Sequence, residues 1–159
     1  MSTQKSLTLI TCLLSGLTTA ATIQPPTYVC QRAAEAINID GKAEEAAWQS
    51  AQPLSPLRDI EGSAIPNRTT IKLLWDDTYL YVHADMQEEQ LWATLAQRDS
   101  VIYRDPDFEV FIDPDGDTKN YVEIEINALN TVWDLLLTEP YRSGNLALHD
   151  WDIPGLKHA

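Results

Sequence analysis

Carboxylate side chains recur at alternate positions in two stretches of this 159-residue sequence. Glu109 and Asp113 lie in DFEVFID (residues 107–113), and Glu123 and Glu125 lie in YVEIEIN (residues 121–127). Both stretches alternate with apolar residues, which is the period of a β-strand. The linking residues DPDGDTKN favour a tight turn. We therefore expect a β-hairpin with apolar residues on one face and carboxylates on the other, and we expect any chemistry at the carboxylate face and the acidic turn.

Sugar recognition is one chemistry that such a face supports. A pyranose stacks its C–H face on an aromatic ring and offers a belt of hydroxyls to acceptors and donors. The candidate platform and acceptors are Tyr103, Glu109, Glu123 and Glu125, and Trp92 is a second aromatic candidate. The alternative is structural: a tyrosine packed at a sheet edge, glutamates on a solvated face, and a tryptophan that covers the core.

The acidic turn offers a second chemistry, which is calcium binding. Asp113, Asp115 and Asp117 alternate through a glycine-containing turn, and hard oxygen ligands at such spacing suit Ca²⁺. The sequence lacks the glutamate that closes an EF-hand loop. The alternative is a plain hairpin turn in which the aspartates accept hydrogen bonds from backbone N–H groups.

Catalysis and haem binding are weaker interpretations. Glu123 and Glu125 point to the same face, and glycosidases use pairs of carboxyl groups, but such spacing is common on strands and nothing in the sequence marks either group as buried with a raised pKa. We therefore expect no catalytic residues. A haem could use His83 and Met86 as ligands, but a spacing of three residues at a strand end is weak evidence.

Composition and the N-terminus restrict the class of protein. The net charge of −13 argues against binding to nucleic acid through phosphates. Residues 1–21 have the pattern of a secretory signal peptide, with Lys5, an apolar run and small residues near Ala20, and the run is too short for a membrane span. We expect a secreted or periplasmic protein; a lipoprotein modified at Cys12 is the alternative. Cleavage would leave Cys30 without an intrachain disulfide partner.

The remaining sequence predicts an antiparallel β-sandwich, jelly-roll-like, with one short N-terminal helix. Residues 22–36 form a linker or edge segment, residues 37–41 a short strand, and residues 42–51 a helix that packs Trp48 against the core. Residues 69–85 form another hairpin, in which Ile71, Leu73 and Trp75 share a face. Residues 131–137 form a further strand, and we expect Trp75 and Trp133 to lie in the core. The sandwich domain is expected to span residues 37–159.

Four motifs in a fixed order resemble the carbohydrate-binding module family 9 domain of secreted xylanases and other glycoside hydrolases. They are IDGKAEEAAW, TTIKLLWDDTYLYVHAD, DFEVFIDPDGD and YVEIEIN, which together cover about residues 37–134. The resemblance implies a β-sandwich that binds polysaccharide or oligosaccharide chains between two aromatic rings and holds structural calcium. It also implies a glycoside hydrolase as a partner.

The resemblance assigns roles by position. The first aromatic wall falls at Tyr103 and the hydroxyl-binding glutamate at Glu109. A family arginine falls at Glu125, so an expected donor is replaced by an acceptor. The second wall and the closing strands of the family lie beyond Ala159, so we expect an incomplete domain. A glycoside hydrolase whose catalytic part is missing or encoded elsewhere is the alternative function.

Overall fold

The computed structural model describes residues 27–54, 63, 69–144 and 146–159. The predicted signal peptide and Cys12 lie outside these residues. The strands are β1 (Gln31–Arg32), β2 (Thr69–Trp75), β3 (Leu80–Met86), β4 (Asp107–Ile112), β5 (Tyr121–Asn127), β6 (Val132–Leu137) and β7 (Ala147–Leu148). Single turns of 3₁₀ helix form η1 (Ala46–Gln49), η2 (Ile102–Arg104) and η3 (Tyr141–Ser143).

The first sheet has the order β1-β2-β3. β2 and β3 are the predicted hairpin, with Leu74 opposite Tyr81 and Leu73 opposite Val82. Its turn is held by Asp76, whose carboxylate accepts the N–H groups of Thr78 and Tyr79. β1 pairs with β2 in the parallel direction.

The second sheet has the order β4-β5-β6-β7, with all neighbours antiparallel. β4 and β5 are the hairpin predicted from the alternating carboxylates. Val110 lies opposite Ile124 and Glu109 opposite Glu125, so the aliphatic residues lie on one face and the carboxylates, together with Phe111, on the other. The prediction of this hairpin is therefore confirmed.

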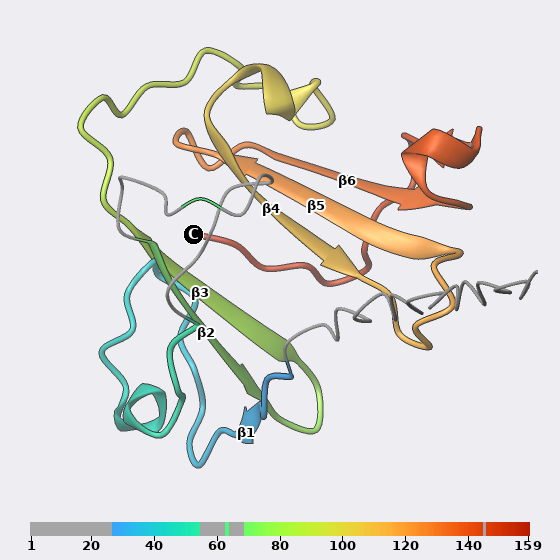
Figure 1. The fold of residues 1–159 in the computed structure, drawn as a ribbon. Coiled ribbons are helices and arrows are strands. Elements are labelled where there is room, and N and C mark those ends of the chain that lie inside the picture. Colours follow the sequence, from blue (N-terminus) through green and yellow to red (C-terminus); the bar gives the residue numbers. More distant parts are fainter. Residues whose placement is uncertain (1–26, 55–62, 64–68, 145) are drawn as a thin grey trace, which may run out of the picture.

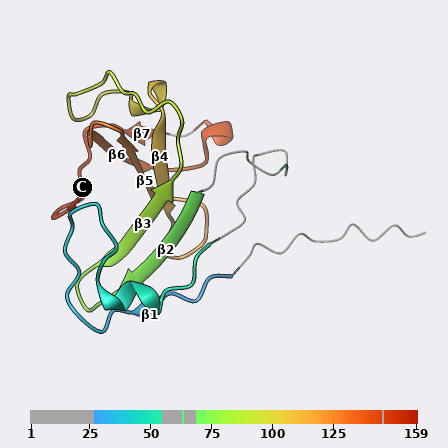
Figure 2. The ribbon, with the colours of Figure 1, turned by 90° about the vertical axis from the view of Figure 1, so that its left-hand side faces the viewer.

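The two sheets form separate layers of a β-sandwich (Figures 1 and 2). Apolar side chains of β2–β3 and of β4–β5 lie on the inner faces and are half-buried. The C-terminal segment runs between the sheets in Figure 1. It contacts a turn of each sheet. The His158 ring nitrogen is 2.7 Å from the side-chain oxygen of Asn130, between β5 and β6, and the Lys157 ammonium lies 4.7 Å from the centre of the Tyr79 ring, between β2 and β3.

Two fully buried apolar clusters cover the outer faces. On the first sheet, η1 packs Trp48 against β2 and β3 in a cluster of Ala33, Ala47, Trp48, Ala51, Leu74 and Tyr81. On the second sheet, Ile102 of η2 packs on Trp133, Leu135 and Leu137 of β6. The predicted burial of Trp48 and Trp133 is confirmed, whereas the prediction that Trp75 lies in the core is wrong, since Trp75 is exposed.

The predicted N-terminal helix is reduced to η1, and residues 37–41 form no strand. Glu45, at the N-cap, makes no side-chain cap and instead accepts the N–H of Asn38. The backbone N–H of Ala47 donates a hydrogen bond to the Glu35 carboxylate. These tertiary contacts hold the segment in an irregular conformation. An isolated helix of about ten residues is only marginally stable in water, so helix propensity alone does not outweigh the contacts.

Within the described part of the chain, no helix has both the length and the apolar character that crossing a lipid bilayer requires.

Candidate functional site

The outer face of the second sheet carries a cluster of four carboxylates, which we call the carboxylate cluster: Asp107, Glu109, Glu123 and Glu125. Strand pairing aligns Glu109 with Glu125, and Phe111 with Glu123. Because side chains alternate along a strand, all four residues lie on one face, as the sequence predicts. On β6, this face carries Trp133, Leu135 and Leu137.

Two members of the cluster are buried rather than solvated. Glu123 is 2% exposed and Glu125 is 1% exposed, whereas Glu109 is exposed. The alternation pattern cannot reveal this, because the covering groups come from η2 and η3, which are distant in sequence. The alternative interpretation, in which the glutamates form a solvated face, is therefore wrong for these two residues.

Tyr103 lies in η2 at the edge of the cluster. Its backbone N–H donates a hydrogen bond of 2.8 Å to Glu125 Oε2, and its side chain remains 59% exposed. Its ring lies 6.2 Å from that of Trp133. Ile102, which is fully buried, anchors η2. The exposed ring offers an apolar face to solvent.

Asp105 fixes the segment that carries Tyr103. Its carboxylate accepts the backbone N–H groups of Thr94 and Leu95, the Thr94 hydroxyl and the Asn127 side-chain amide, all at 2.8–2.9 Å. Burial acts to raise the pKa of Asp105, but these hydrogen bonds outweigh it and hold the pKa below its ordinary value. The segment before η2 is thereby tied to β5.

Tyr141 is a candidate site residue that sequence reasoning missed. It lies in η3, its hydroxyl donates to Glu123 Oε2, and its side chain is 56% exposed. The predicted irregular character of residues 141–159 concealed it, and no motif marked it. Two exposed tyrosines are thus attached to two neighbouring buried carboxylates.

The burial of the cluster changes its acid–base behaviour. Desolvation, followed by the charges of neighbouring acids, raises the pKa of Glu125 to about 8 and that of Asp107 to about 6. Burial also raises the pKa of Glu123, against the hydrogen bond from Tyr141. Burial and the bond to Glu123 raise the pKa of the Tyr141 hydroxyl. No pattern in the sequence indicated these raised pKa values.

Trp92 lies between β3 and η2 and is exposed. Among the residues that the structure describes, it makes no hydrogen bond or ring contact with the carboxylate cluster. The structure therefore does not bring Trp92 together with Tyr103 and the glutamates.

The geometry of the acidic turn is compatible with calcium binding and with an ordinary hairpin turn. Oxygen atoms of Asp113, Asp115 and Asp117 lie within 4.8 Å of one another. Each carboxylate also accepts backbone N–H groups of the turn, with Asp113 binding those of Gly116 and Thr118. The three hard oxygen donors fit Ca²⁺ by type, and the hydrogen bonds fit an ordinary turn.

The proposed haem ligands are separated by the pleat of β3. His83 pairs with Lys72 and packs 5.6 Å from the Trp48 ring, on the face that bears η1. Met86 is three residues away, so it points to the opposite face. One haem iron cannot take both ligands from this strand.

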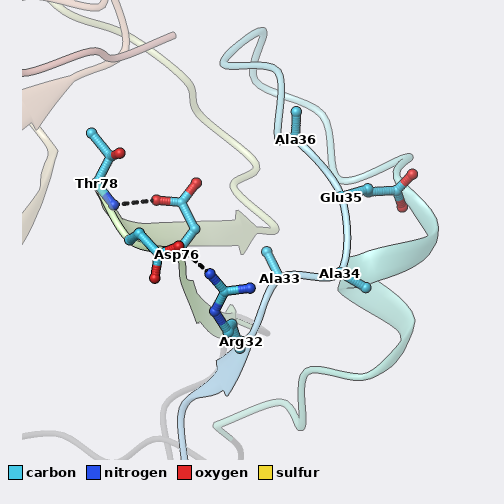
Figure 3. A pocket seen from close by; sticks show the side chains of 8 residues that line it. Arg32, Ala33, Ala34, Glu35, Ala36, Asp76 and Thr78 are labelled. Atoms are coloured by element: carbon cyan, nitrogen blue, oxygen red, sulfur yellow. Dashed lines mark hydrogen bonds and ion pairs between the residues drawn. The ribbon is translucent and has the colours of Figure 1, made fainter.

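A hollow of about 310 Å³ lies away from the carboxylate cluster, beside β1 and the β2–β3 turn (Figure 3). It is lined by residues 32–36 and 76–78. Arg32 forms an ion pair with Asp77, Asp76 accepts the Thr78 N–H, and Glu35 accepts the Ala47 N–H. None of the predicted site residues lines it.

The two sheets define the chain as a β-sandwich. Residues 39–142 match the family described as "Carbohydrate family 9 binding domain-like". The match covers more than half of the chain, so this protein belongs to that family of carbohydrate-binding modules, and the resemblance seen in the sequence is confirmed.

The chain is similar to parts of two larger proteins. It is 36% identical over 86 residues to "Endo-1,4-beta-xylanase A" of Thermoanaerobacterium saccharolyticum and 34% identical over 86 residues to "Exoglucanase XynX" of Acetivibrio thermocellus. Each match covers 54% of this chain and 7% of the relative. The matched stretch is therefore a small part of either relative. No solved structure matches the chain.

Proposed function

We propose that this protein is a non-catalytic module that binds polysaccharide or oligosaccharide chains at the outer face of its second sheet. The observation that carries the proposal is the exposed Tyr103 ring beside the carboxylate cluster, in a chain of the carbohydrate-binding family 9. Tyr103 stacks on the C–H face of a sugar and Glu109 accepts hydrogen bonds from its hydroxyls. Glu123 and Glu125, which are buried, act mainly by holding Tyr141 and the Tyr103 backbone in place.

Replacement of the platform tests this site. Tyr103→Ala removes the stacking surface, so the affinity for soluble gluco- and xylo-oligosaccharides should fall about tenfold or more, given that aromatic contacts contribute on the order of 1 kcal/mol beyond buried area. Isothermal titration calorimetry measures the change. Tyr79→Ala, which removes another exposed tyrosine at the β2–β3 turn, is the matched control. Unchanged affinity in Tyr103→Ala would exclude this site, and Trp92→Ala tests the second aromatic candidate in the same assay.

Catalysis by this chain is the competing function, and the raised pKa of Glu125 is the observation that favours it. A buried carboxyl that keeps its proton near neutral pH is typical of general acids. However, Glu125 and Glu123 lie side by side under two tyrosines and are almost inaccessible to a substrate. We expect no release of reducing sugar from xylan or glucan, and release that disappears in Glu125→Gln would contradict a purely binding role.

A role in secreted carbohydrate breakdown follows from the N-terminal sequence and the relatives. The first 21 residues have a signal-peptide pattern, and the two relatives are named as an endo-1,4-beta-xylanase and an exoglucanase. We propose that the protein is exported, to the periplasm or the medium, and there works with a glycoside hydrolase. Its N-terminal sequence after export, read by mass spectrometry, tests cleavage near Ala20.

Structural calcium at the acidic turn is a further part of the proposal. Asp113, Asp115 and Asp117 would hold the ion and tie together the β4–β5 connection. Because an ion that binds only the folded state stabilises it, added Ca²⁺ should raise the melting temperature and a chelator should lower it. Asp115→Asn should remove the difference, whereas Asp85→Asn, at an exposed position of β3, should not. Equal melting temperatures with Ca²⁺ and with chelator would identify the turn as metal-free.

A further inference from the structure

Exposed aromatic rings occur at more than one place on the outer face of the second sheet. Tyr103 of η2 is 59% exposed, Phe111 of β4 is 50% exposed and Tyr141 of η3 is 56% exposed. Phe111 lies on the outer face because it pairs with Glu123 of β5, whereas the other apolar residues of β4 point to the inner face. A group of exposed apolar side chains on one face is typical of a surface that contacts a ligand.

These rings form two platforms. The first platform is Tyr103, which is attached to Glu125 through its backbone N–H. The second platform consists of Phe111 and Tyr141, which meet at Glu123: Phe111 pairs with Glu123 across the hairpin, and the Tyr141 hydroxyl donates to the Glu123 carboxylate. Each platform therefore belongs to a different glutamate of β5.

The strand sets the offset between the two platforms. Glu123 and Glu125 are two residues apart on β5, which corresponds to about 7 Å along the strand. η2 and η3, which carry the two tyrosines, accordingly lie at different places along the second sheet (Figure 1). Glu109 is exposed, pairs with Glu125 and is two residues from Phe111 on β4, so an open acceptor accompanies the platforms. An offset of this size is comparable with the length of a sugar unit.

The buried glutamates support the platforms and need no contact with a ligand. Glu125 holds the backbone of η2, and Glu123 holds the hydroxyl of Tyr141. The groups that remain open to solvent are the three rings and the Glu109 carboxylate. A single terminal sugar covers one platform only, whereas a chain that runs along the sheet covers both.

We infer that this face binds an extended stretch of several sugar units, with one unit stacked on Tyr103 and a later unit on Phe111 and Tyr141. The ligand class is thus the interior of an oligosaccharide or polysaccharide chain, in preference to a single terminal unit. This inference rests on the carbohydrate-binding function proposed above. The C–H faces of the sugars lie on the rings, and Glu109 accepts hydrogen bonds from hydroxyl groups along the chain.

Calorimetric titration with ligands of increasing length tests the inference. The ligands are xylo- and gluco-oligosaccharides from the disaccharide to the hexasaccharide. Affinity should rise with length until both platforms are covered and should then level off. Because an aromatic contact contributes to affinity beyond its buried area, the hexasaccharide should bind about tenfold more tightly than the disaccharide. Reduction of the terminal unit of the hexasaccharide to an alditol should leave its affinity unchanged.

Three variants assign the length dependence to the platforms. Phe111→Ala should weaken binding of the hexasaccharide and leave that of the disaccharide unchanged, whereas Tyr103→Ala should weaken both. Phe111 is half exposed, so its replacement should preserve the fold and gives the decisive result. Tyr141→Ala should act like Phe111→Ala. The matched control is Leu80→Ala, which removes an exposed apolar side chain from β3 of the first sheet and should change neither affinity.

The outcomes distinguish this inference from the proposed function. Equal affinity for all lengths, or equal losses for both ligands in Phe111→Ala, would overturn the inference and leave binding at Tyr103 intact. Loss of hexasaccharide binding after reduction of the terminal unit would also overturn it, because the site would then recognise a chain end. Absence of binding at every length would reject both proposals together.

Discussion

Glu125 is a carboxyl group that the fold removes from water without giving it a cationic partner. Burial is the largest cause of its raised pKa, and the charges of Glu123, Asp107 and Glu109 add to the effect. The N–H of Tyr103 stabilises the charged form but does not reverse the shift. Glu125 therefore links the protonation of the site to the stability of the protein.

This linkage predicts that stability falls as pH rises. The ordinary pKa of 4.5 applies to Glu125 in the unfolded chain, and the folded value is about 8. Between these values the folded state binds more protons than the unfolded state, so the free energy of unfolding decreases with pH and levels off above about 8. Asp107 acts in the same direction, between 3.8 and about 6.

Glu125→Gln should weaken this dependence, because the amide keeps an acceptor for the Tyr103 N–H and cannot ionise. Denaturant titrations at a series of pH values give the slope. Glu44→Gln, at an exposed glutamate before η1, is the matched control and should leave the slope unchanged. A slope in Glu125→Gln equal to that of the parent protein would show that another group is responsible.

At the scale of elements, the segment from Thr94 to Asp105 decides whether the second sheet has a binding face. It has no regular structure of its own apart from η2, and its position depends on Asp105 and on the burial of Ile102. Asn127 contributes from β5, because its side-chain amide donates to Asp105 and to the Leu95 carbonyl. The exposed ring of Tyr103 is thus placed by contacts on the opposite side of its own segment.

Asp105→Asn should destabilise this segment. The substitution removes the charge that four hydrogen bonds share, and hydrogen bonds to charged groups contribute about 1.5–3 kcal/mol. We expect a loss of that order in the free energy of unfolding, together with faster hydrogen exchange at the Thr94 and Leu95 amides. Asp85→Asn, on the exposed part of β3, should change stability by less than about 0.5 kcal/mol. Unaltered exchange at both amides would argue against Asp105 as the anchor.

At the scale of the whole molecule, an ion-pair network joins three distant parts of the chain. Arg98, which precedes η2, contacts Asp134 of β6 and Asp152 of the C-terminal segment. Asp134 is fully buried and also accepts the Ile153 N–H at 2.6 Å. The C-terminal segment, which reaches both sheets, is therefore attached to the second sheet through a buried charge.

Arg98→Met should leave Asp134 buried without its cation, at a cost of about 1–3 kcal/mol or somewhat more. Urea denaturation measures the loss. Arg32→Met is the matched control, because its pair with Asp77 is exposed on both sides, so it should cost about 0–1 kcal/mol. Equal losses in the two variants would show that the buried network has no special role.

The sequence by itself determined the hairpins and the residues that share each face. Alternation with a period of two decides which side chains lie together on a pleated strand, and the register confirms it for Glu109, Glu123 and Glu125. The family motifs, which occur in a fixed order, identified a carbohydrate-binding module. By contrast, the Ala- and Glu-rich residues 42–51 favoured a helix, and tertiary contacts through Glu35, Glu45 and Trp48 allow only one turn of 3₁₀ helix.

Only the tertiary structure decided which carboxylates are buried. A local pattern assigns a face, but the segments that cover the face come from residues 94–105 and 138–143, which no periodicity relates to β5. For this reason Tyr141 was missed, and the raised pKa of Glu125 had no signal in the sequence. Burial and the balance of charge depend on the arrangement of segments distant in the chain, and that arrangement makes an alternating strand into an acidic site edged by two tyrosines.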